Sequence, residues 1–463
     1  MESAKQESNG DHMEPFRIHL FICTQQKPEG VTCCPGSGSL AVLEALNREV
    51  RAHGLDDDVQ LTTCGCMGLC DEGPVMVVYP AGVWYRKVQA ADVPEIVTSH
   101  LRDGRPVERM VWNDAAAMKA MAIEHRDKYR AAMAARDKAG ILPDWLDQML
   151  RGYMPSRCIL TALELDIFNV VGDGASAALV AKKVGASERG VGMLLNALVA
   201  LKVLTKNGSE YRNSAEAARY FARGSRDDQR SGLLHVANIW HRWSTMTEAV
   251  RRGTRVAIDR EGFPDWTRDF IAAMQHNAKQ RASQVVKALG TEGARRVLDL
   301  GGGSGVYSIA FAQASPNVRC EILDVPEVVP LTTDYVNKAG VSAQVTIRAG
   351  DMLRDDFGSG FDLVMLNAIC HMFSEEQNRE LFRRARRALA PNGRLAVQDF
   401  LLNAEKTAPQ RAALFSLNML VATEGGASYS EVEYAEWLTA AGFSDVRRIK
   451  LPPPSDLMVG VVK

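Results

Sequence analysis

The stretch RRVLDLGGGSGVYSIAFAQA at residues 295–314 decides the fold of the C-terminal part of the chain. Its first residues include an apolar run that predicts a buried β-strand, and its last residues predict a helix. Between them, Gly301, Gly303 and Gly305 predict a tight turn at which a ligand can approach the backbone closely. The pattern alone does not identify the ligand, because dinucleotide sites share it.

The residues that follow predict four more strands that alternate with helices. Their patterns are VRCEILDVPEVV at 318–329, VTIRAGDML at 345–353, FDLVMLNAICHMF at 361–373 and GRLAVQDFLL at 393–402. This alternation predicts an α/β fold with a doubly wound, Rossmann-like parallel sheet over residues 290–463. Ligands bind at the carboxyl ends of such strands, where Asp324, Asp351 and His371 lie. A carboxylate at Asp324 can accept hydrogen bonds from both ribose hydroxyls of a nucleoside.

The composition excludes several classes of protein. The length of 463 residues suggests two or three domains, and 46% hydrophobic with 24% charged residues is ordinary for globular proteins. The formal net charge of −1 disfavours nucleic acid as a partner, because phosphate binding requires clustered lysine and arginine. No apolar run reaches the roughly 18 residues of a membrane-spanning helix. The polar N-terminus lacks the order of a signal peptide, so we expect a cytoplasmic protein without a membrane partner.

Residues 150–225 predict helices followed by a short hairpin, which is a winged-helix pattern. Ser187 is a good N-cap for the second helix of a helix-turn-helix, and LTKNGSEYRNS predicts a hairpin that turns at Asn207-Gly208. DNA recognition would require polar side chains on that second helix, but VGMLLNALVALKVL is apolar nearly all round. We therefore expect residues 150–289 to form a dimerisation unit with substrate-lid helices.

The ordered set DLGGGSG, LDVPEVV, GDM, HMFSEEQ, PNGRL and AGF resembles class I S-adenosylmethionine (SAM)-dependent methyltransferases. With the winged-helix pattern, residues 150–463 are similar to small-molecule O-methyltransferases of the caffeate-type and bacterial groups. The resemblance implies a homodimer that binds SAM and a small-molecule acceptor. The SAM-binding residues that it implies are Asp299, Gly301, Gly303, Gly305, Asp324, Val325, Asp351 and Met352. It also implies an acceptor pocket lined by Phe270, Met274 and Asn418.

His371 matches the catalytic base of that family. A phenol titrates near 10, so a histidine near neutrality assists methyl transfer by taking the proton of the acceptor. Asp399, at the end of the fifth strand, is the acid expected beside this base. The second acid of the family is missing, because residues 425–429 read GGASY. Two alternatives are a purely structural histidine and covalent catalysis by Cys370, which strand alternation points away from His371.

The cysteines are concentrated in the N-terminal part of the chain. Six of the nine lie between Cys23 and Cys70, which points to metal or redox chemistry in a reducing compartment. Residues 15–112 predict the order β-α-β-β-α of a thioredoxin-like half, with the cysteines at strand ends and in the following loops. Four thiolates can hold an iron–sulfur cluster. Zinc is the alternative, although structural zinc usually takes two closely spaced cysteine pairs.

The segments FICT, CPGSG and GCMGLCDEGPVMVVYPAGVWY resemble the thioredoxin-like [2Fe-2S] ferredoxins. The resemblance covers residues 15–112 and implies that the cluster ligands are Cys23, Cys34, Cys66 and Cys70. Cys33 and Cys64 are additional thiols. They are either bystanders or substitute ligands and redox partners.

Residues 113–149 separate the two parts of the chain. They are rich in alanine with interspersed charges, which predicts a helix that ends at Gly140. We interpret this segment as a helical linker. A coiled-coil partner site is the alternative, but its apolar seam is thin.

Three functions follow from these patterns. The first is an O-methyltransferase whose ferredoxin domain senses redox state or docks an electron-transfer partner. The second is a redox enzyme on a methyltransferase scaffold, which carries out hydroxylation, decarboxylation or reductive chemistry with electrons from the cluster. The third is an electron carrier with a degenerate methyltransferase body, which the glycine-rich turn, Asp324 and His371 disfavour.

Overall fold

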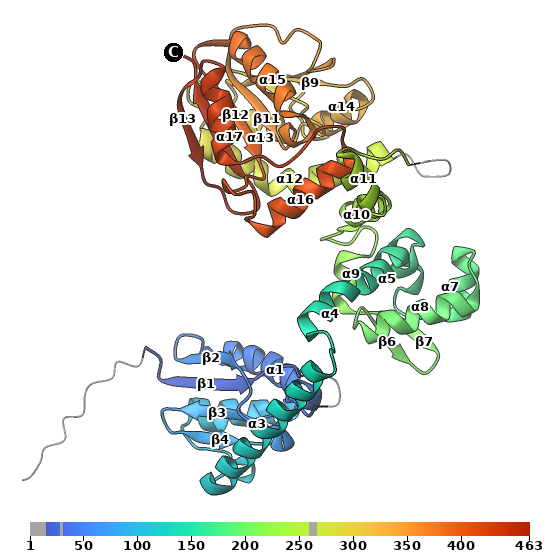
Figure 1. Cartoon of the computed structure of the whole chain (residues 1–463), viewed down its shortest axis with the longest axis vertical. Helices are drawn as coiled ribbons and strands as arrows, with labels where there is room; N and C mark the ends of the chain where they lie inside the picture. The colour runs from blue at the N-terminus through green and yellow to red at the C-terminus, as the bar shows by residue number, and fades with distance from the viewer. Residues whose placement is uncertain (1–14, 28–30, 259–265) are drawn as a thin grey trace, which may run out of the picture. The chain divides into compact units, whose positions relative to one another are not determined.

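The computed structural model describes residues 15–27, 31–258 and 266–463, which divide into two compact units at Gly152 and Tyr153 (Figure 1). The first unit contains the cysteine-rich segment. The second contains the winged-helix region and the glycine-rich turn.

The first unit is built on a four-stranded sheet with the order β2-β1-β3-β4. Its strands are β1 (Ile18–Cys23), β2 (Val59–Cys64), β3 (Met76–Tyr79) and β4 (Val83–Tyr85). β1 is parallel to β2 and antiparallel to β3, and β3 is antiparallel to β4. Two helical segments, α1 (Ser39–Ala52) and the run from α2 (Val93–Glu95) through Ile96–Arg102, supply apolar side chains to the core. The order β-α-β-β-α expected from the sequence is therefore incomplete, because residues 76–85 form two strands, β3 and β4, and the order is β-α-β-β-β-α.

The helix expected as a linker packs against the first unit. α3 (Ala115–Lys138) begins after Asp114, whose side chain accepts a hydrogen bond from the Ala117 N–H. Met118, Met121 and Ala122 pack against a small cluster formed by Leu69, Val75 and Trp112. α3 is therefore not a free spacer between two folded parts. The short helix α4 (Asp144–Arg151) follows it.

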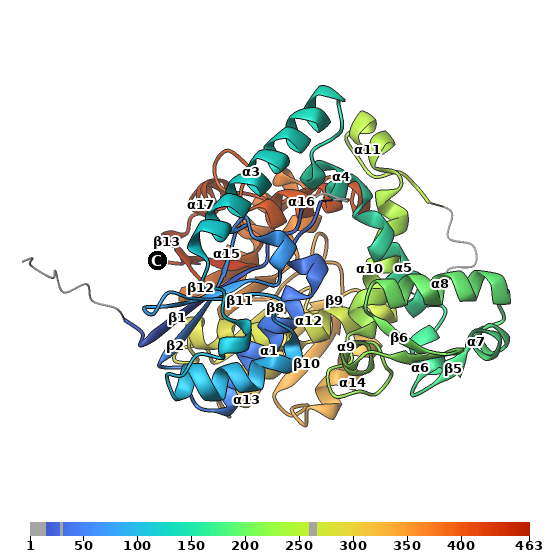
Figure 2. The ribbon, with the colours of Figure 1, turned by 90° about the horizontal axis from the view of Figure 1, so that it is seen from below.

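The second unit begins with the winged-helix region. Its helices are α5 (Tyr153–Glu164), α6 (Ile167–Val171), α7 (Ala177–Val184), α8 (Glu188–Ala200) and α9 (Ala215–Tyr220). The small sheet has the order β5-β7-β6, with β5 (Ala175–Ser176), β6 (Leu204–Asn207) and β7 (Glu210–Asn213). Figure 2 shows α7 and α8 beside this sheet. Ser187 caps α8 as expected, and Val191, Leu195 and Leu198 of α8 are buried, which does not suit a DNA-recognition helix.

A seven-stranded sheet forms the rest of the second unit, in the order β10-β9-β8-β11-β12-β14-β13. The strands are β8 (Arg296–Leu300), β9 (Arg319–Asp324), β10 (Val345–Ala349), β11 (Phe361–Asn367), β12 (Leu389–Asp399), β13 (Ser444–Ile449) and β14 (Asp456–Val461). The first five are parallel, and β14 is antiparallel to β12 and β13. The doubly wound sheet expected from the sequence is confirmed.

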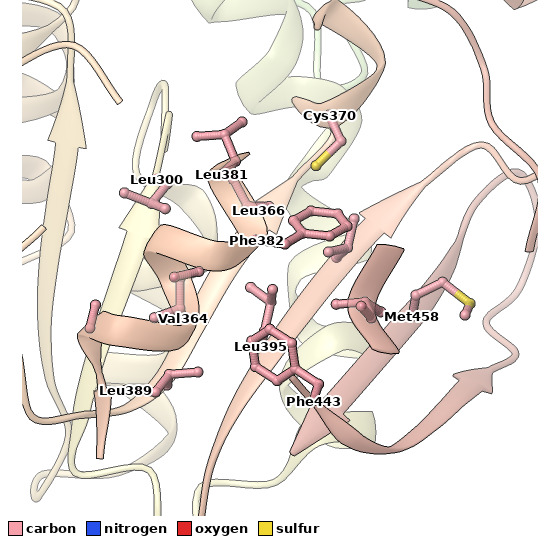
Figure 3. Close-up of a cluster of buried hydrophobic side chains, with 14 of the residues drawn as sticks. Leu300, Val364, Leu366, Cys370, Leu381, Phe382, Leu389, Leu395, Phe443 and Met458 are labelled. Atoms are coloured by element: carbon pink, nitrogen blue, oxygen red, sulfur yellow. The ribbon is translucent and has the colours of Figure 1, made fainter. Parts of the chain in front are cut away.

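Helices cover both faces of this sheet, so both faces are apolar. They are α12 (Trp266–Leu289), α13 (Val306–Ala314), α14 (Val329–Lys338), α15 (Glu375–Ala388) and α17 (Glu431–Ala440). Two further helices, α10 (Arg230–Trp243) and α11 (Met246–Arg252), pack against α16 (Gln410–Ala422). Along β11, Leu363 and Met365 enter one core, and Val364 and Leu366 enter the other. Figure 3 shows the second core, where Phe382 of α15 packs on the strands. These cores fix the strand ends that carry the polar residues.

No helix in the described parts of the chain is long and apolar enough to span a membrane.

Gly68 allows α3 to approach the cysteine loop, and its substitution tests that packing. Its φ is +80°, and a Cβ added there would lie 2.9 Å from Ala122 Cα. We expect Gly68→Ala to lower the free energy of unfolding by about 1–3 kcal/mol, because it adds backbone strain and overpacking. Urea unfolding and amide hydrogen exchange of α3 measure the effect.

Gly82→Ala is the matched control. Gly82 also has a positive φ of +65°, but a Cβ there would meet no atom within 4 Å. If both variants exchange α3 amides at the wild-type rate, α3 does not depend on this contact.

Candidate functional site

The glycine-rich turn lies at the carboxyl end of β8 and is held by the next strand, β9. The Gly301 N–H donates to the Leu323 carbonyl at 2.8 Å, and the Gly303 N–H donates to Asp324 Oδ2 at 2.7 Å. The other carboxylate oxygen of Asp324 accepts the Val325 N–H at 2.8 Å. The structure therefore brings the turn and Asp324 together, as the sequence predicted.

The glycine-rich turn has no room for side chains at Gly301 and Gly305. Gly301 and Gly305 have φ values of +66° and +73°. A Cβ at Gly301 would lie 2.7 Å from Met352 Cε, and one at Gly305 would lie 2.9 Å from Ile322 Cδ1. The turn can therefore take no side chain without moving its neighbours, and its backbone stays accessible at close range.

Unpaired polar atoms are buried at the ends of β8 and β11. Asp299 is fully buried, its Oδ2 accepts from Ser308 Oγ at 2.8 Å, and its Oδ1 has no hydrogen-bond partner among the described residues. Both polar side-chain atoms of Asn367 also lack a partner within hydrogen-bond distance among the described residues, although this amide lies near enough to Asp299 to act to lower the pKa of that carboxyl. Burial raises the pKa of Asp299 to about 6. Buried polar atoms are normally paired, so these fit a polar ligand such as the amino-acid portion of SAM.

The remaining expected SAM residues lie nearby. Met352 lies over Gly301 through its Cε. Asp351 is half-buried and its Oδ1 accepts the Leu353 N–H at 2.8 Å. The Val325 side chain is largely exposed at the end of β9.

His371 and Asp399 form a buried hydrogen-bonded pair. His371 Nδ1 lies 2.7 Å from Asp399 Oδ1, and the His371 N–H donates to Asp399 Oδ2 at 3.1 Å. Burial alone would raise the pKa of Asp399, but the charge of His371 and the hydrogen bonds from His371 and Tyr434 hold that pKa below its usual value. An ionised Asp399 keeps the proton on Nδ1 and leaves Nε2 free to accept one.

Tyr434 of α17 completes this arrangement, and sequence analysis missed it. Its hydroxyl donates to Asp399 Oδ2 at 2.8 Å, and its side chain is fully buried. The second acid of the family is missing at residues 425–429, and Gly426 there lies directly against the His371 backbone. The separation of 35 residues between Asp399 and Tyr434 gives no local pattern that could have predicted the contact.

Aromatic rings surround the His371 ring. The Phe415 ring lies 4.8 Å away edge-on, and the Phe400 ring lies 5.9 Å away. Of the three expected pocket residues, Asn418 accepts a hydrogen bond from Trp243 Nε1 at 2.9 Å. Phe270 contacts the His235 ring at 5.2 Å.

Met274 is half-buried on α12. α10, which carries Trp243 and His235, packs against both α12 and α16. The three expected pocket residues therefore lie on helices that pack around one common helix.

Cys370 cannot act as a nucleophile in this geometry. Its side chain is fully buried in the apolar core beside Leu366 and Phe382 (Figure 3). Burial raises its pKa well above the usual thiol value.

The four cysteines implied as cluster ligands converge in the first unit, and all are free thiols. Cys66 Sγ and Cys70 Sγ lie 3.4 Å apart. Contact with the Cys34 thiol lowers the pKa of both Cys23 and Cys70 below the usual thiol range. A Cβ at Gly73 would lie 3.0 Å from Cys34 Sγ, so glycine is needed beside the thiols.

A buried lysine faces these thiols. Lys27 Nζ donates to Cys70 Sγ at 3.0 Å, and only 6% of the residue is exposed. Burial acts to lower the pKa of Lys27, but Cys70 and Cys66 raise it, so the side chain is an ammonium at neutral pH.

Within residues 15–27, 31–258 and 266–463, no group of three or more His, Cys, Asp or Glu side chains is arranged to hold a metal ion. The thiols instead form one continuous set of contacts, in which Cys34 touches both Cys23 and Cys70, and Cys70 also touches Cys66. Four cysteine thiolates are the donor set of a [2Fe-2S] cluster, and a structural zinc ion takes the same donor set.

Comparison with known proteins identifies the second unit. Residues 256–444 match the model of the O-methyltransferase domain, and residues 147–223 match that of the O-methyltransferase dimerisation domain. The chain is 31% identical over 320 residues to 3-hydroxy-5-methyl-1-naphthoate 3-O-methyltransferase of Streptomyces sahachiroi, covering 67% of this chain and 92% of that protein. The chain belongs to the O-methyltransferase family.

Two more similarities support the same assignment. The methyltransferase is 29% identical to the tetracenomycin polyketide synthesis 8-O-methyl transferase of Streptomyces glaucescens, over 68% of this chain and 95% of that protein. The crystal structure of human N-acetylserotonin methyltransferase in complex with SAM has a TM-score of 0.61 at 26% identity, covering 69% of this chain and 96% of that chain. The chain is therefore a SAM-dependent O-methyltransferase. Both family-model matches lie C-terminal of residue 146.

Removing the Tyr434 hydroxyl tests its part in orienting Asp399. We expect Tyr434→Phe to lower kcat of the methyltransferase about 10- to 100-fold, because a hydrogen bond to a charged group contributes about 1.5–3 kcal/mol. The SAM KM should stay unchanged. S-adenosylhomocysteine formation measures both constants.

Tyr429→Phe is the control, because the Tyr429 hydroxyl donates to the Phe373 carbonyl at 2.6 Å and not to Asp399. Equal kcat values for wild type and Tyr434→Phe would show that Asp399 needs no support from Tyr434.

Proposed function

We propose that this methyltransferase methylates a hydroxyl of a small aromatic or enolic acceptor, with His371 as the general base. The observation that carries the proposal is the buried hydrogen bond of 2.7 Å between His371 Nδ1 and Asp399 Oδ1. It leaves Nε2 as the proton acceptor on the aromatic side of the site.

The chemistry needs alignment and a proton acceptor. When bound, SAM supplies an electrophilic methyl group, and the acceptor oxygen must approach it in line. A phenol titrates near 10 and is protonated at neutral pH, so His371 Nε2 accepts the phenolic proton as the methyl group is transferred to the oxygen. Asp399 stabilises the imidazolium that results. Fixed orientation of both reactants supplies a further large part of the acceleration.

The residues at the glycine-rich turn fit SAM. We propose that Gly301, Gly303 and Gly305 face the amino-acid portion, that Asp299 Oδ1 accepts from its ammonium, and that Asp324 accepts from the ribose hydroxyls. Asp351 with Met352, and Val325, are proposed to flank the adenine and ribose. The unpaired Asp299 Oδ1 supports this arrangement, because an ammonium satisfies it.

An aromatic acceptor fits the other side of His371. Phe400 and Phe415 present rings beside the base, and such rings stack on planar substrates. The name of the relative from Streptomyces sahachiroi includes a hydroxynaphthoate, which supports a fused aromatic acceptor here. We propose that Phe270, Met274 and Asn418 complete the pocket.

Substitution of the base tests this function. We expect His371→Ala to lower kcat about 10²–10⁴-fold, because general-base catalysis contributes this range. SAM affinity should not change. The assay is S-adenosylhomocysteine formation with a panel of phenols and enols, alongside calorimetric SAM binding. Wild-type activity in His371→Ala would refute the general base, and tight SAM binding without turnover of any hydroxyl would favour the redox-enzyme alternative.

The dimerisation-domain match supports a homodimer. α4 lies partly within that match, and its apolar residues are unusually exposed. Trp145, Met149 and Leu150 are 63%, 65% and 59% exposed. We propose that a second copy of the chain covers this face of α4, since isolated domains rarely leave such a face in water.

We further propose that the first unit is a thioredoxin-like ferredoxin domain holding a [2Fe-2S] cluster through Cys23, Cys34, Cys66 and Cys70. The convergence of these four thiols supports it. The proposed division of the chain is residues 15–112 for this domain, 113–149 for the connecting helices, 150–289 for dimerisation and lid, and 290–463 for SAM binding. The cluster would control methylation by its redox state or receive electrons from a docked partner.

Serine substitutions test the ligand set. We expect each of Cys23→Ser, Cys34→Ser, Cys66→Ser and Cys70→Ser to lose most of the iron and acid-labile sulfide found in anaerobically purified wild type. Cys33→Ser and Cys64→Ser are matched controls that should keep both, because they are outside the proposed set. Absence of iron from wild type, or equal iron in all six variants, would refute the ligand set.

Methylation by the holoprotein with the cluster oxidised, and then reduced, tests redox control. Turnover in one state only supports a switch, whereas equal turnover in both states refutes redox control of methylation.

A further inference from the structure

Lys27 connects the cysteines to helix α3. Its ammonium donates to Cys70 Sγ at 3.0 Å and lies 5.5 Å from the centre of the Tyr129 ring on α3. A cation over an aromatic face is attracted to it, so the ring holds the ammonium on the side of the thiols. Lys27 is almost completely buried, so water does not screen its charge strongly.

α3 is fixed over the same loop by further contacts. His125 Nε2 lies 2.8 Å from Asp71 Oδ2, next in sequence to Cys70. Met121 and Ala122 pack against the cluster that contains Leu69. The position of Tyr129 relative to Cys70 is therefore set by packing on both sides of the loop, not by Lys27 alone.

A positive charge at this place has a specific consequence for electron transfer. Addition of one electron to a cluster held by Cys70 makes the group one unit more negative, with no bond formed or broken and no proton moved. The Lys27 ammonium therefore stabilises the reduced cluster, which is more negative, more strongly than the oxidised cluster. Hydrogen bonds to ligand sulfurs are among the factors that set the reduction potentials of iron–sulfur clusters.

We propose that Lys27 raises the reduction potential of the cluster, and that Tyr129 of α3 is the positioning residue that holds the Lys27 ammonium against Cys70. This inference rests on the proposed [2Fe-2S] cluster of the first unit. It gives α3 a role in the redox site, beyond connecting that unit to the methyltransferase. The electron donor would be a one-electron reductant such as a reduced ferredoxin or flavin.

The test measures the midpoint potential of the full-length holoprotein by an anaerobic titration with dithionite, followed by absorbance and circular dichroism. At a fixed ambient potential, Lys27→Met should lower the ratio of reduced to oxidised cluster at least tenfold, which is about 59 mV for one electron. Lys27→Arg keeps the charge and should change the ratio less than Lys27→Met. Lys119→Met, which removes an exposed charge from α3, should leave it unchanged.

Variants of Tyr129 test the positioning role. Tyr129→Leu should lower the ratio in the same direction but by less than Lys27→Met, and Tyr129→Phe, which keeps a ring, should match wild type. These variants leave the cysteines and Lys27 in place, so they decide the question even if Lys27→Met fails to retain iron. A wild-type potential in Tyr129→Leu would then overturn the inference.

Iron and sulfide content distinguish a failure of the proposed cluster from a failure of the proposed role of Lys27. Wild type without iron refutes the proposed cluster. Wild type and Lys27→Met with equal iron, equal dichroism and equal potentials would leave the cluster in place and overturn the role of Lys27.

Discussion

The buried carboxylate of Asp399 is the constraint on which the catalytic part of the structure depends. It is 2% exposed and accepts hydrogen bonds from His371 Nδ1, the His371 N–H, the Phe400 N–H and the Tyr434 hydroxyl. A buried charge that loses a partner costs about 3–5 kcal/mol. The end of β12, the turn that carries His371, and α17 must therefore keep their relative positions, and the imidazole is held in one orientation before any substrate binds.

The same principle explains the opposite arrangement at the carboxyl ends of β8 and β11. Asp299 and Asn367 are buried at the ends of β8 and β11 with polar atoms that no described residue pairs. Such atoms destabilise the free protein and favour a ligand that pairs them. The Asp399 carboxylate therefore has several hydrogen-bond donors, whereas Asp299 Oδ1, where SAM is expected to bind, has none among the described residues. This contrast suits a site that binds and releases its methyl donor in each turnover but keeps the orientation of its base fixed.

In the first unit, a helix whose composition suggested a spacer is packed against the folded domain. Residues 115–138 are rich in alanine and charge, and this composition suggested a spacer helix. The few larger side chains on one face, including Met118 and Met121, nevertheless pack on the loop between Leu69 and Val75, and His125 reaches Asp71. A helix with weak overall amphipathicity can be held firmly by a small number of contacts and close backbone approach at a glycine such as Gly68. Its contacts place it in the cysteine-rich unit.

The sequence by itself determined the elements whose causes are local. The strand-turn-helix at 295–314, the positions of Asp324 and Asp399 at strand ends, and the grouping of cysteines at strand ends and in the following loops follow from periodicity, glycine and spacing, since neighbours along the chain produce these patterns. The strand predicted through His371 was too long, because β11 ends at Asn367 and His371 lies in the 3-10 helix Cys370–Met372. The sequence also predicted dimerisation and not DNA binding for residues 150–225, because the second helix is apolar where a DNA-binding helix must be polar. Tertiary structure alone decided that Tyr434 supports Asp399, that Phe415 lies on His371, and that Lys27 lies between Cys70 and Tyr129. These partners are separated by tens of residues, and only the packing of α3, α16 and α17 brings them together.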